Sequence, residues 1–293
     1  MADRKHLVQV ARPEIAYAPE SFNAVGVVEK PLSTAERLTN NTLLRRIVLL
    51  VALALLWQGY ASYLNNDLLF PTFTATMDAL YVGIKTGGLL GKAWTSISVL
   101  LVGYALGIAL ATVLTVFAIT TRVGNDILET LTSMFNPLPA IALLPLALIW
   151  FGLGEGSLIF VLVHSVLWAV ALNTHSGFMA VSPTMRMVGR NYGLTGFAYV
   201  GRILIPAAFP SILAGLKIGW AFAWRTLIAA ELVFGVSAGS GGLGWFIYQN
   251  KNQLEIPSVF AGLFMVIFIG LVVENLIFKV AERLTVRKWG MQA

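Results

Sequence analysis

GLTGFAYVGRILIP, residues 193–206, lies between two of the most apolar stretches of the chain. The segment carries a single charged residue, Arg202, has glycines at positions 193 and 196, and ends at Pro206. Glycine and proline at such places favour a turn followed by the start of a new helix. The stretch therefore indicates a bent connection between two long apolar helices.

The composition of the whole chain indicates that these helices lie in a membrane. Of 293 residues, 57% are hydrophobic and 12% are charged, and the mean hydropathy is +0.78. Soluble domains carry about 25% charged residues, so this chain lacks the polarity needed to cover its surface in water. We expect an all-α polytopic membrane protein. It has no cysteine, which excludes disulfides and thiolate metal sites.

Six segments are apolar enough to be predicted as transmembrane helices, each needing roughly 20 residues to cross a bilayer. They lie at about residues 47–64, 94–120, 127–153, 157–172, 207–236 and 258–278. Pro137, Pro139 and Pro145 interrupt the third segment, which predicts a kink or a broken start there. The predicted organisation is a cytoplasmic arm over residues 1–45, without the apolar core of a signal peptide, followed by a transmembrane domain over 46–293.

The distribution of lysine and arginine predicts the orientation. If the N-terminus is cytoplasmic, 16 of the 20 basic residues fall on the inner side. Three lysines (85, 92 and 251) fall on the outer side, and Arg225 lies within a span. By the positive-inside rule both termini and the 193–206 stretch are cytoplasmic. This pattern explains the net positive charge without a nucleic-acid partner.

The inner connection between the fourth and fifth spans is predicted to form two short helices at an elbow, over about residues 183–205. Ser182 and Pro183 are a typical cap and first residue of a helix. That helix should run to Tyr192, with Gly193 in the left-handed conformation that ends it. Thr195 can cap a second helix with one face returning to the membrane, formed by Phe197, Val200, Ile203 and Leu204. The elbow is either an amphipathic linker or a docking element for a soluble partner.

The spacing in this connection resembles a loop of the membrane subunits of ATP-binding-cassette (ABC) importers. That loop has the form Glu-Ala-Ala, three residues, Gly, nine residues, Ile, one residue, Leu-Pro. Here Gly193 is followed after nine residues by Ile203, Leu204, Ile205 and Pro206, whereas Met187-Val188-Gly189 replaces Glu-Ala-Ala. The segments LPLALIWFGLGEGS, AWRTLIAAELVFG and GGLGWFI are similar to the nitrate, sulfonate and taurine branch. The resemblance extends from about Leu68 to the C-terminus.

The resemblance implies the permease fold of type I ABC importers in a bacterial inner membrane. Two copies, most simply a homodimer, would form the path, and an extracytoplasmic binding protein would deliver a small anion such as a sulfonate, taurine or nitrate. Two ATPase subunits would bind ATP, so this chain would hold no cofactor. The residues implied in coupling to the ATPase are Arg186, Met187, Val188, Gly189, Arg190, Asn191, Tyr192, Gly193, Leu194, Thr195, Ile203 and Pro206.

Other motifs do not support nucleotide binding or catalysis. GSGGLG, residues 239–244, satisfies the dinucleotide-binding pattern but follows an apolar helix rather than a strand, and orientation places it outside the cell. It is better explained as an outer turn. The sequence contains no G-x-x-x-x-G-K-[ST] motif, no catalytic dyad and no set of metal ligands. The chain is therefore not expected to be an enzyme.

Charges within the spans need a partner or a wet cavity. Arg225 and Glu231 lie in the fifth span, about 120° apart on a helix, and Glu274 lies in the sixth. Two roles remain open: these charges stabilise the helix bundle, or they line the substrate path. The path candidates are Arg225, Glu231, Trp224 and His164.

Small residues at intervals of four predict close helix packing in two spans. They are Gly103, Gly107 and Ala111 in the second span, and Gly215, Gly219 and Ala223 in the fifth. The main functional alternative to an importer subunit is a secondary transporter that acts without an ATPase. That alternative predicts an internal repeat with matching broken helices, which the sequence does not show.

Overall fold

The computed structural model describes residues 40–234 and 241–288, and all regular structure within them is helical. The chain divides into two compact units after Leu53. The described part of the first unit is the beginning of α2 (Thr42–Leu64), where the side chain of Asn41 accepts hydrogen bonds from the backbone N–H groups of Leu43 and Leu44. The predicted arm, 1–45, lies almost entirely outside the described residues, and its role stays a prediction.

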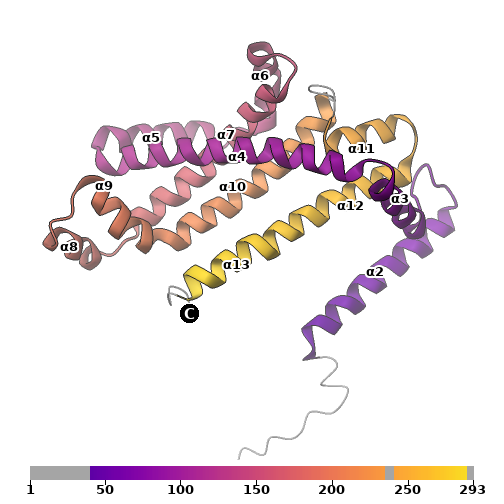
Figure 1. The fold of residues 1–293 in the computed structure, drawn as a ribbon, viewed down its shortest axis with the longest axis horizontal. Helices are drawn as coiled ribbons and strands as arrows, with labels where there is room; N and C mark the ends of the chain where they lie inside the picture. The colour runs from indigo at the N-terminus through magenta and orange to yellow at the C-terminus, as the bar shows by residue number, and fades with distance from the viewer. Residues whose placement is uncertain (1–39, 235–240, 289–293) are drawn as a thin grey trace, which may run out of the picture. The chain divides into compact units, whose positions relative to one another are not determined.

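Five helical runs in the described residues are long and apolar enough to cross a membrane (Figure 1). They confirm the all-α polytopic fold, and a sixth span is reached when one bent helix pair is counted as a single span. The five runs are α2, α4 (Leu89–Thr120), α7 (Glu155–Met179), the run from α9 into α10 (Gly196–Val233) and the run that begins with α12 (Ile256–Arg287).

The third predicted span is the bent pair. α5 (Arg122–Phe135) is followed by a 3₁₀ turn, η1 (Ala140–Leu143), and by α6 (Leu144–Phe151), with a bend of 89° between the two parts. The predicted break is confirmed. Its cause is local: Pro137 and Pro139 have no backbone N–H to continue the hydrogen bonds of α5, and their rings clash with the preceding turn.

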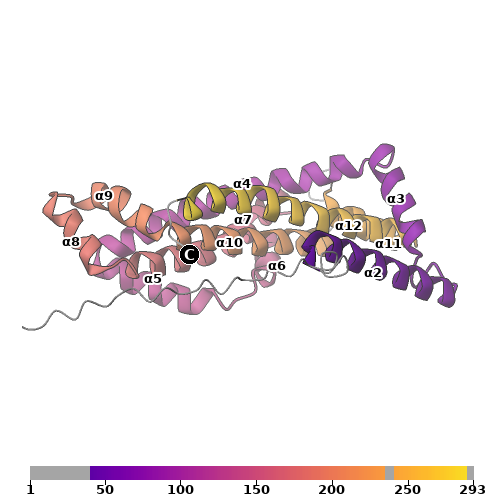
Figure 2. The ribbon, with the colours of Figure 1, turned by 90° about the horizontal axis from the view of Figure 1, so that it is seen from below.

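α7 lies at the centre of the helix packing, with α4 and α10 (Ile205–Phe234) running alongside it in both views (Figures 1 and 2). The small residues that recur at intervals of four on α4 and α10 make these contacts, as predicted. A Cβ atom on Gly107 of α4 would lie 2.6 Å from Cβ of Val166 on α7. A Cβ atom on Gly215 of α10 would lie 2.8 Å from Cβ of Asn173 on α7. The backbones of α4 and α10 therefore pack directly against side chains of α7 at these glycines.

Two short helices were not predicted: α3 (Phe73–Lys85) and α11 (Leu243–Asn252), which both pack on α12 (Ile256–Val272). Aromatic contacts of Trp57, on α2, help to fix the position of α3, since the Trp57 and Phe73 ring centroids lie 5.8 Å apart. Trp57 stacks on Phe264 of α12 at 5.7 Å, and its indole N–H donates to the carbonyl oxygen of Pro71 at 2.8 Å. Trp57 is thus a packing residue. Tyr60 and Tyr63 of the same helix are exposed.

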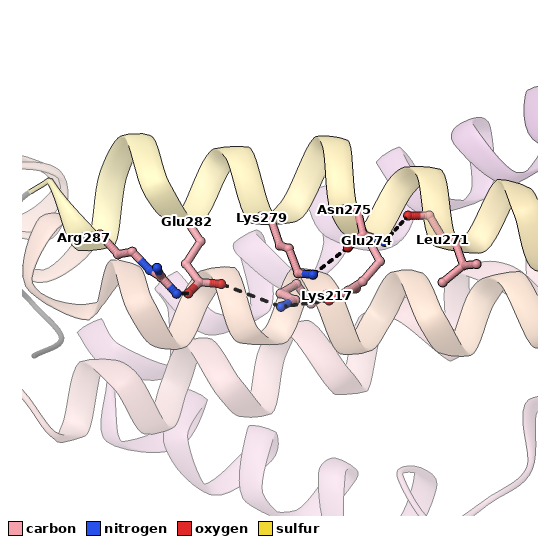
Figure 3. Close-up of polar contacts among 7 residues, drawn as sticks. All are labelled: Lys217, Leu271, Glu274, Asn275, Lys279, Glu282 and Arg287. Atoms are coloured by element: carbon pink, nitrogen blue, oxygen red, sulfur yellow. Dashed lines mark hydrogen bonds and ion pairs between the residues drawn. The ribbon is translucent and has the colours of Figure 1, made fainter. Parts of the chain in front are cut away.

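The last membrane helix continues well past residue 278. α12 passes into the π-helical segment η3 (Val273–Phe278), α13 (Lys279–Glu282) and η4 (Arg283–Arg287) without a break. Lys217 of α10 lies 3.1 Å from Glu274 and 3.9 Å from Glu282, and Glu282 lies 3.4 Å from Arg287 (Figure 3). These ion pairs give Glu274 the partner that its place in a span requires. They attach the C-terminal turns to α10.

Candidate functional site

The elbow between α7 and α10 is formed as the sequence predicts. α8 (Pro183–Asn191) begins at Ser182, whose side chain accepts a hydrogen bond from the N–H of Met185. Gly193 has φ +69°, and the N–H of Leu194 donates to the carbonyl oxygen of Gly189 at 3.0 Å. This is a left-handed helix ending that glycine adopts without strain.

The second half of the elbow departs slightly from the prediction. Thr195 precedes α9 (Gly196–Tyr199) at the cap position, but its side chain makes no capping hydrogen bond. The π-helical segment η2 (Val200–Leu204) then leads directly into α10. Val200 and Leu204 are buried, whereas Phe197 is 80% exposed and does not lie on the returning face as predicted. α9 is a single turn, so it is too short for helical periodicity to define a returning face that includes Phe197.

The elbow is tied firmly to the helices on either side. Arg186 donates from Nε to the carbonyl oxygen of Val181 at 3.1 Å and from Nη2 to that of Phe178 at 2.6 Å. Gly189 packs against Ile203 and the ring of Tyr199, where a Cβ atom would lie 2.9 Å from both. A small core joins the end of α7 to the start of α10; its buried members are Phe178, Val181, Val200, Leu204 and Ala208.

α8 exposes several apolar side chains, together with the polar Thr184, Arg190 and Asn191. Met185, Met187 and Val188 are exposed, and Tyr192 is 80% exposed. Among the predicted coupling residues, Gly189 is buried and Arg186, Leu194 and Ile203 are partly buried. The remaining ones are exposed: Met187, Val188, Arg190, Asn191, Tyr192, Gly193, Thr195 and Pro206. The buried residues hold the elbow together, and the exposed ones are available to a partner.

A cavity of about 370 Å³ lies beside the helix break. The break between α5 and η1 forms one side, α7 the second and α10 the third. The lining residues are Asn136, Pro137, Leu138, Pro139, Ala140 and Ile141 from the break, His164, Ser165 and Trp168 from α7, and Phe222, Arg225, Thr226 and Ala229 from α10.

Several polar groups of this lining are buried without a hydrogen-bond partner in the described residues. They are both ring nitrogens of His164 and the indole nitrogen of Trp168. Phe135 stacks on the Trp168 ring at 5.5 Å, with 11° between the planes. The hydroxyl of Ser165 on α7 donates a hydrogen bond to the hydroxyl oxygen of Thr226 on α10, at 3.1 Å. The guanidinium of Arg225 lies 5.8 Å from the centre of the Phe222 ring.

Two of the four path candidates line this cavity, and two do not. Arg225 and His164 do. Trp224 is 7% exposed and packs in the main core. Glu231 is 4% exposed and bonds instead to Ser96 of α4 and to the N–H of Gly244 at the start of α11. The roles of all four in the path stay predictions, but Glu231 now has a structural partner.

Sequence reasoning missed most of the cavity lining, including the polar residues Asn136, Ser165, Trp168 and Thr226. One signal was available, because Trp168 follows His164 by four residues and so shares its helix face. Of the predicted outer turn, residues 239 and 240 lie outside the described residues. Gly241 and Gly242 are buried, with Gly242 directly against Ser96 and Glu231.

Comparison with known proteins supports one family. Residues 103–286 match the model of the binding-protein-dependent transport system inner membrane component family. The chain is 31% identical to a Methanocaldococcus jannaschii protein named as an ABC transporter permease, over 82% of this chain and 90% of that protein. It is 29% identical to the nitrate import permease protein NrtB of Synechocystis, over 78% and 83% of the two chains. It is 31% identical to the taurine transport system permease protein TauC of Escherichia coli, over 55% and 57%.

Proposed function

The chain belongs to the family of binding-protein-dependent transport system inner membrane components, and from this membership we propose that it forms the translocation path of an ATP-driven importer for a small anion. It is a multi-pass inner membrane protein of the ABC transporter permease type. Nitrate and taurine appear in the names of two relatives, and Arg225 supplies a charge of matching sign. An extracytoplasmic binding protein would deliver the anion, and two copies of the chain would enclose the path.

ATP hydrolysis belongs to a partner subunit in this proposal. The sequence has no phosphate-binding loop of the P-loop type. The energy of ATP must therefore reach the membrane helices through a contact with a separate protein. The elbow is the best candidate for that contact, because it joins α7 to α10 through a short, well-connected segment.

The docking role is supported by two features of α8: it exposes apolar side chains, and it is hydrogen-bonded to the end of α7. Met185, Met187, Val188 and Tyr192 expose hydrophobic surface on α8. An amphipathic helix of this kind fits a hydrophobic groove on a partner. Elsewhere on the same helix, Arg186 donates to the carbonyl oxygen of Phe178 in the last turn of α7 and to that of Val181 just after it. A push on α8 would therefore be transmitted to α7.

The mechanism follows from this connection. When the ATPase subunits close on ATP, they move the elbow, and the elbow moves α7 and α10. These two helices form two sides of the cavity. Their movement relative to the helix break would open the cavity first to one side of the membrane and then to the other.

Substitution of Met187 by Asp tests the docking role. Met187 is 55% exposed, so the change should leave the fold intact while placing a charge in the contact. The tagged permease is co-expressed with its ATPase and binding protein, and copurification and solute uptake are measured. Both should be lost. Leu254→Asp is the matched control, since Leu254 is 64% exposed in the turn before α12, and it should retain both.

Two results would contradict the proposal. If Met187→Asp copurifies with the ATPase as well as the unchanged chain does, α8 is not the docking element. If the permease alone, reconstituted in vesicles without any ATPase, carries out solute uptake, the chain is a secondary transporter.

A further inference from the structure

The cavity beside the helix break has the properties of a site rather than of a packing defect. Its volume, about 370 Å³, is at the lower end of the roughly 300–1,000 Å³ typical of small-molecule sites. One side of it is a non-helical backbone segment within a membrane span, residues 136–139. Such backbone is tolerated at membrane depth where it lines a water-filled cavity or is buried in protein. A hydrated cavity would satisfy the backbone groups that the break, caused by the prolines, leaves without helical partners.

The charge of the cavity is positive and uncompensated in the described residues. Arg225 is the charged member of the lining, and the lining contains no Asp or Glu among the residues that the structure describes. The nearby carboxylate, Glu231, already accepts hydrogen bonds from Ser96 and Gly244. The guanidinium of Arg225 lies over the ring of Phe222. Arg225 thus lines the cavity without an ion pair to a carboxylate among the described residues.

The N–H groups of Trp168 and His164 in the cavity wall could also donate hydrogen bonds to a bound anion. The indole of Trp168 can only donate a hydrogen bond. It is 7% exposed, and its Nε1 atom has no partner within the described part of the chain. The stack of Phe135 on Trp168 restrains the plane of the indole. His164, one turn earlier on α7, presents a second unsatisfied ring N–H. A buried donor without a partner is costly, and a ligand with several acceptor oxygens would remove that cost.

We propose that this cavity binds the transported oxyanion directly during its passage. The Arg225 guanidinium would neutralise the charge of a sulfonate or nitrate group, and the N–H groups of Trp168 and His164 would donate to its oxygens. The apolar walls at Ile141 and Phe222 would contact the remainder of the solute. This proposal rests on the importer function proposed above. It adds that the permease itself selects for anions, instead of leaving all selection to the binding protein.

The test uses the complete permease–ATPase complex in lipid nanodiscs, without a binding protein. Equilibrium binding is measured with radiolabelled ethanesulfonate, and nitrate serves as a competing anion. Ethyl methyl sulfone, which has similar size and no charge, is the neutral competitor. We expect ethanesulfonate to bind, nitrate to compete and the sulfone to fail to compete.

Variants assign the binding to the cavity. Arg225→Gln should weaken ethanesulfonate binding at least tenfold, whereas Arg225→Lys, which keeps the charge, should retain part of it. Trp168→Phe keeps the ring that stacks on Phe135 but removes the N–H donor, and should weaken binding severalfold. Lys251→Gln removes an exposed cation on α11 and should change nothing.

Failure of this inference can be distinguished from failure of the importer function. Unchanged ethanesulfonate binding in Arg225→Gln, equal competition by the neutral sulfone, or no binding to a complex that still supports uptake would overturn the cavity proposal while leaving the importer in place. Loss of ATPase copurification by the unchanged permease would overturn the importer function. Binding to the isolated permease would then still report on the cavity.

Discussion

The hydroxyl of Ser96 on α4 lies 2.9 Å from both carboxylate oxygens of Glu231 on α10, and it accepts the N–H of Leu243 at 2.8 Å. The N–H of Gly244 donates to the same carboxylate, also at 2.8 Å. Two residues from different spans thereby hold the first turn of α11. Gly242 makes this possible, because a Cβ atom there would overlap Ser96 and the Glu231 carboxylate.

Ser96→Ala should destabilise the protein. The change leaves the Leu243 N–H without its acceptor and removes a donor from a buried carboxylate, which together cost about 1–3 kcal/mol. The measurement is thermal unfolding of the purified complex in detergent. Ser98→Ala is the control, because the Ser98 hydroxyl bonds only within its own helix, to the carbonyl oxygen of Thr95. Equal melting temperatures for the two variants would mean that the Ser96–Glu231 contact contributes little.

Gly107→Ala should also destabilise the protein, by about 1–3 kcal/mol from overpacking. The added Cβ would lie 2.6 Å from Cβ of Val166 and 3.3 Å from the carbonyl oxygen of Val163. Gly91→Ala on the same helix is the control, since a Cβ there meets no atom within 4 Å. It should be neutral or slightly stabilising. Thermal unfolding compares the two, and a Gly107→Ala protein as stable as Gly91→Ala would contradict close packing of α4 on α7.

Gly193→Asp should insert and fold but lose ATPase association and uptake. Gly193 is exposed, with φ +69° and open space at the Cβ position. Asn and Asp both tolerate this conformation better than other residues do. Gly193→Asn therefore controls for the backbone, and it should keep association and uptake because it adds no charge to the docking surface. Loss of ATPase copurification in both variants would point to the backbone instead of the charge.

Reversal of the Lys217–Glu274 pair should restore only part of the stability that either single change removes, because the carboxylate introduced at position 217 would lie beside Glu282. Lys217→Glu and Glu274→Lys each place like charges together, whereas the double variant reforms the pair. The Glu274 side chain is 48% exposed, so the coupling energy should be modest, about 0.2–1 kcal/mol. A double-mutant cycle by thermal unfolding measures it. Purely additive effects would show that the pair in Figure 3 does not contribute to attachment of the C-terminal turns.

The features predicted most accurately from the sequence are helix ends and breaks, which depend only on residues close together in the chain. Ser182, Pro183 and Gly193 define the ends of α8 through capping and a left-handed turn, and neither depends on distant residues. The helix break was likewise predictable from Pro137 and Pro139. The close packing at Gly107 and Gly215 was predictable because a spacing of four alone places small residues on one face of a helix.

Features that depend on packing were not predictable in the same way. α3 and α11 are shorter than a span and carry polar residues, so hydropathy does not detect them, and their contacts with α12 are long-range. Phe197 was assigned to the wrong face because α9 is too short for a periodicity argument. The cavity combines His164, Arg225 and Asn136 from three separate segments. No spacing rule for one helix could bring those residues together.

The tight contacts on two sides of α7 restrict how the molecule can move. Gly107 from α4 and Gly215 from α10 both approach α7 too closely for one helix to slide past another without a collision. α4, α7 and α10 should therefore travel as a single rigid body when the elbow is displaced. We therefore expect bending during transport to occur at the proline segment, residues 136–139, which borders the cavity.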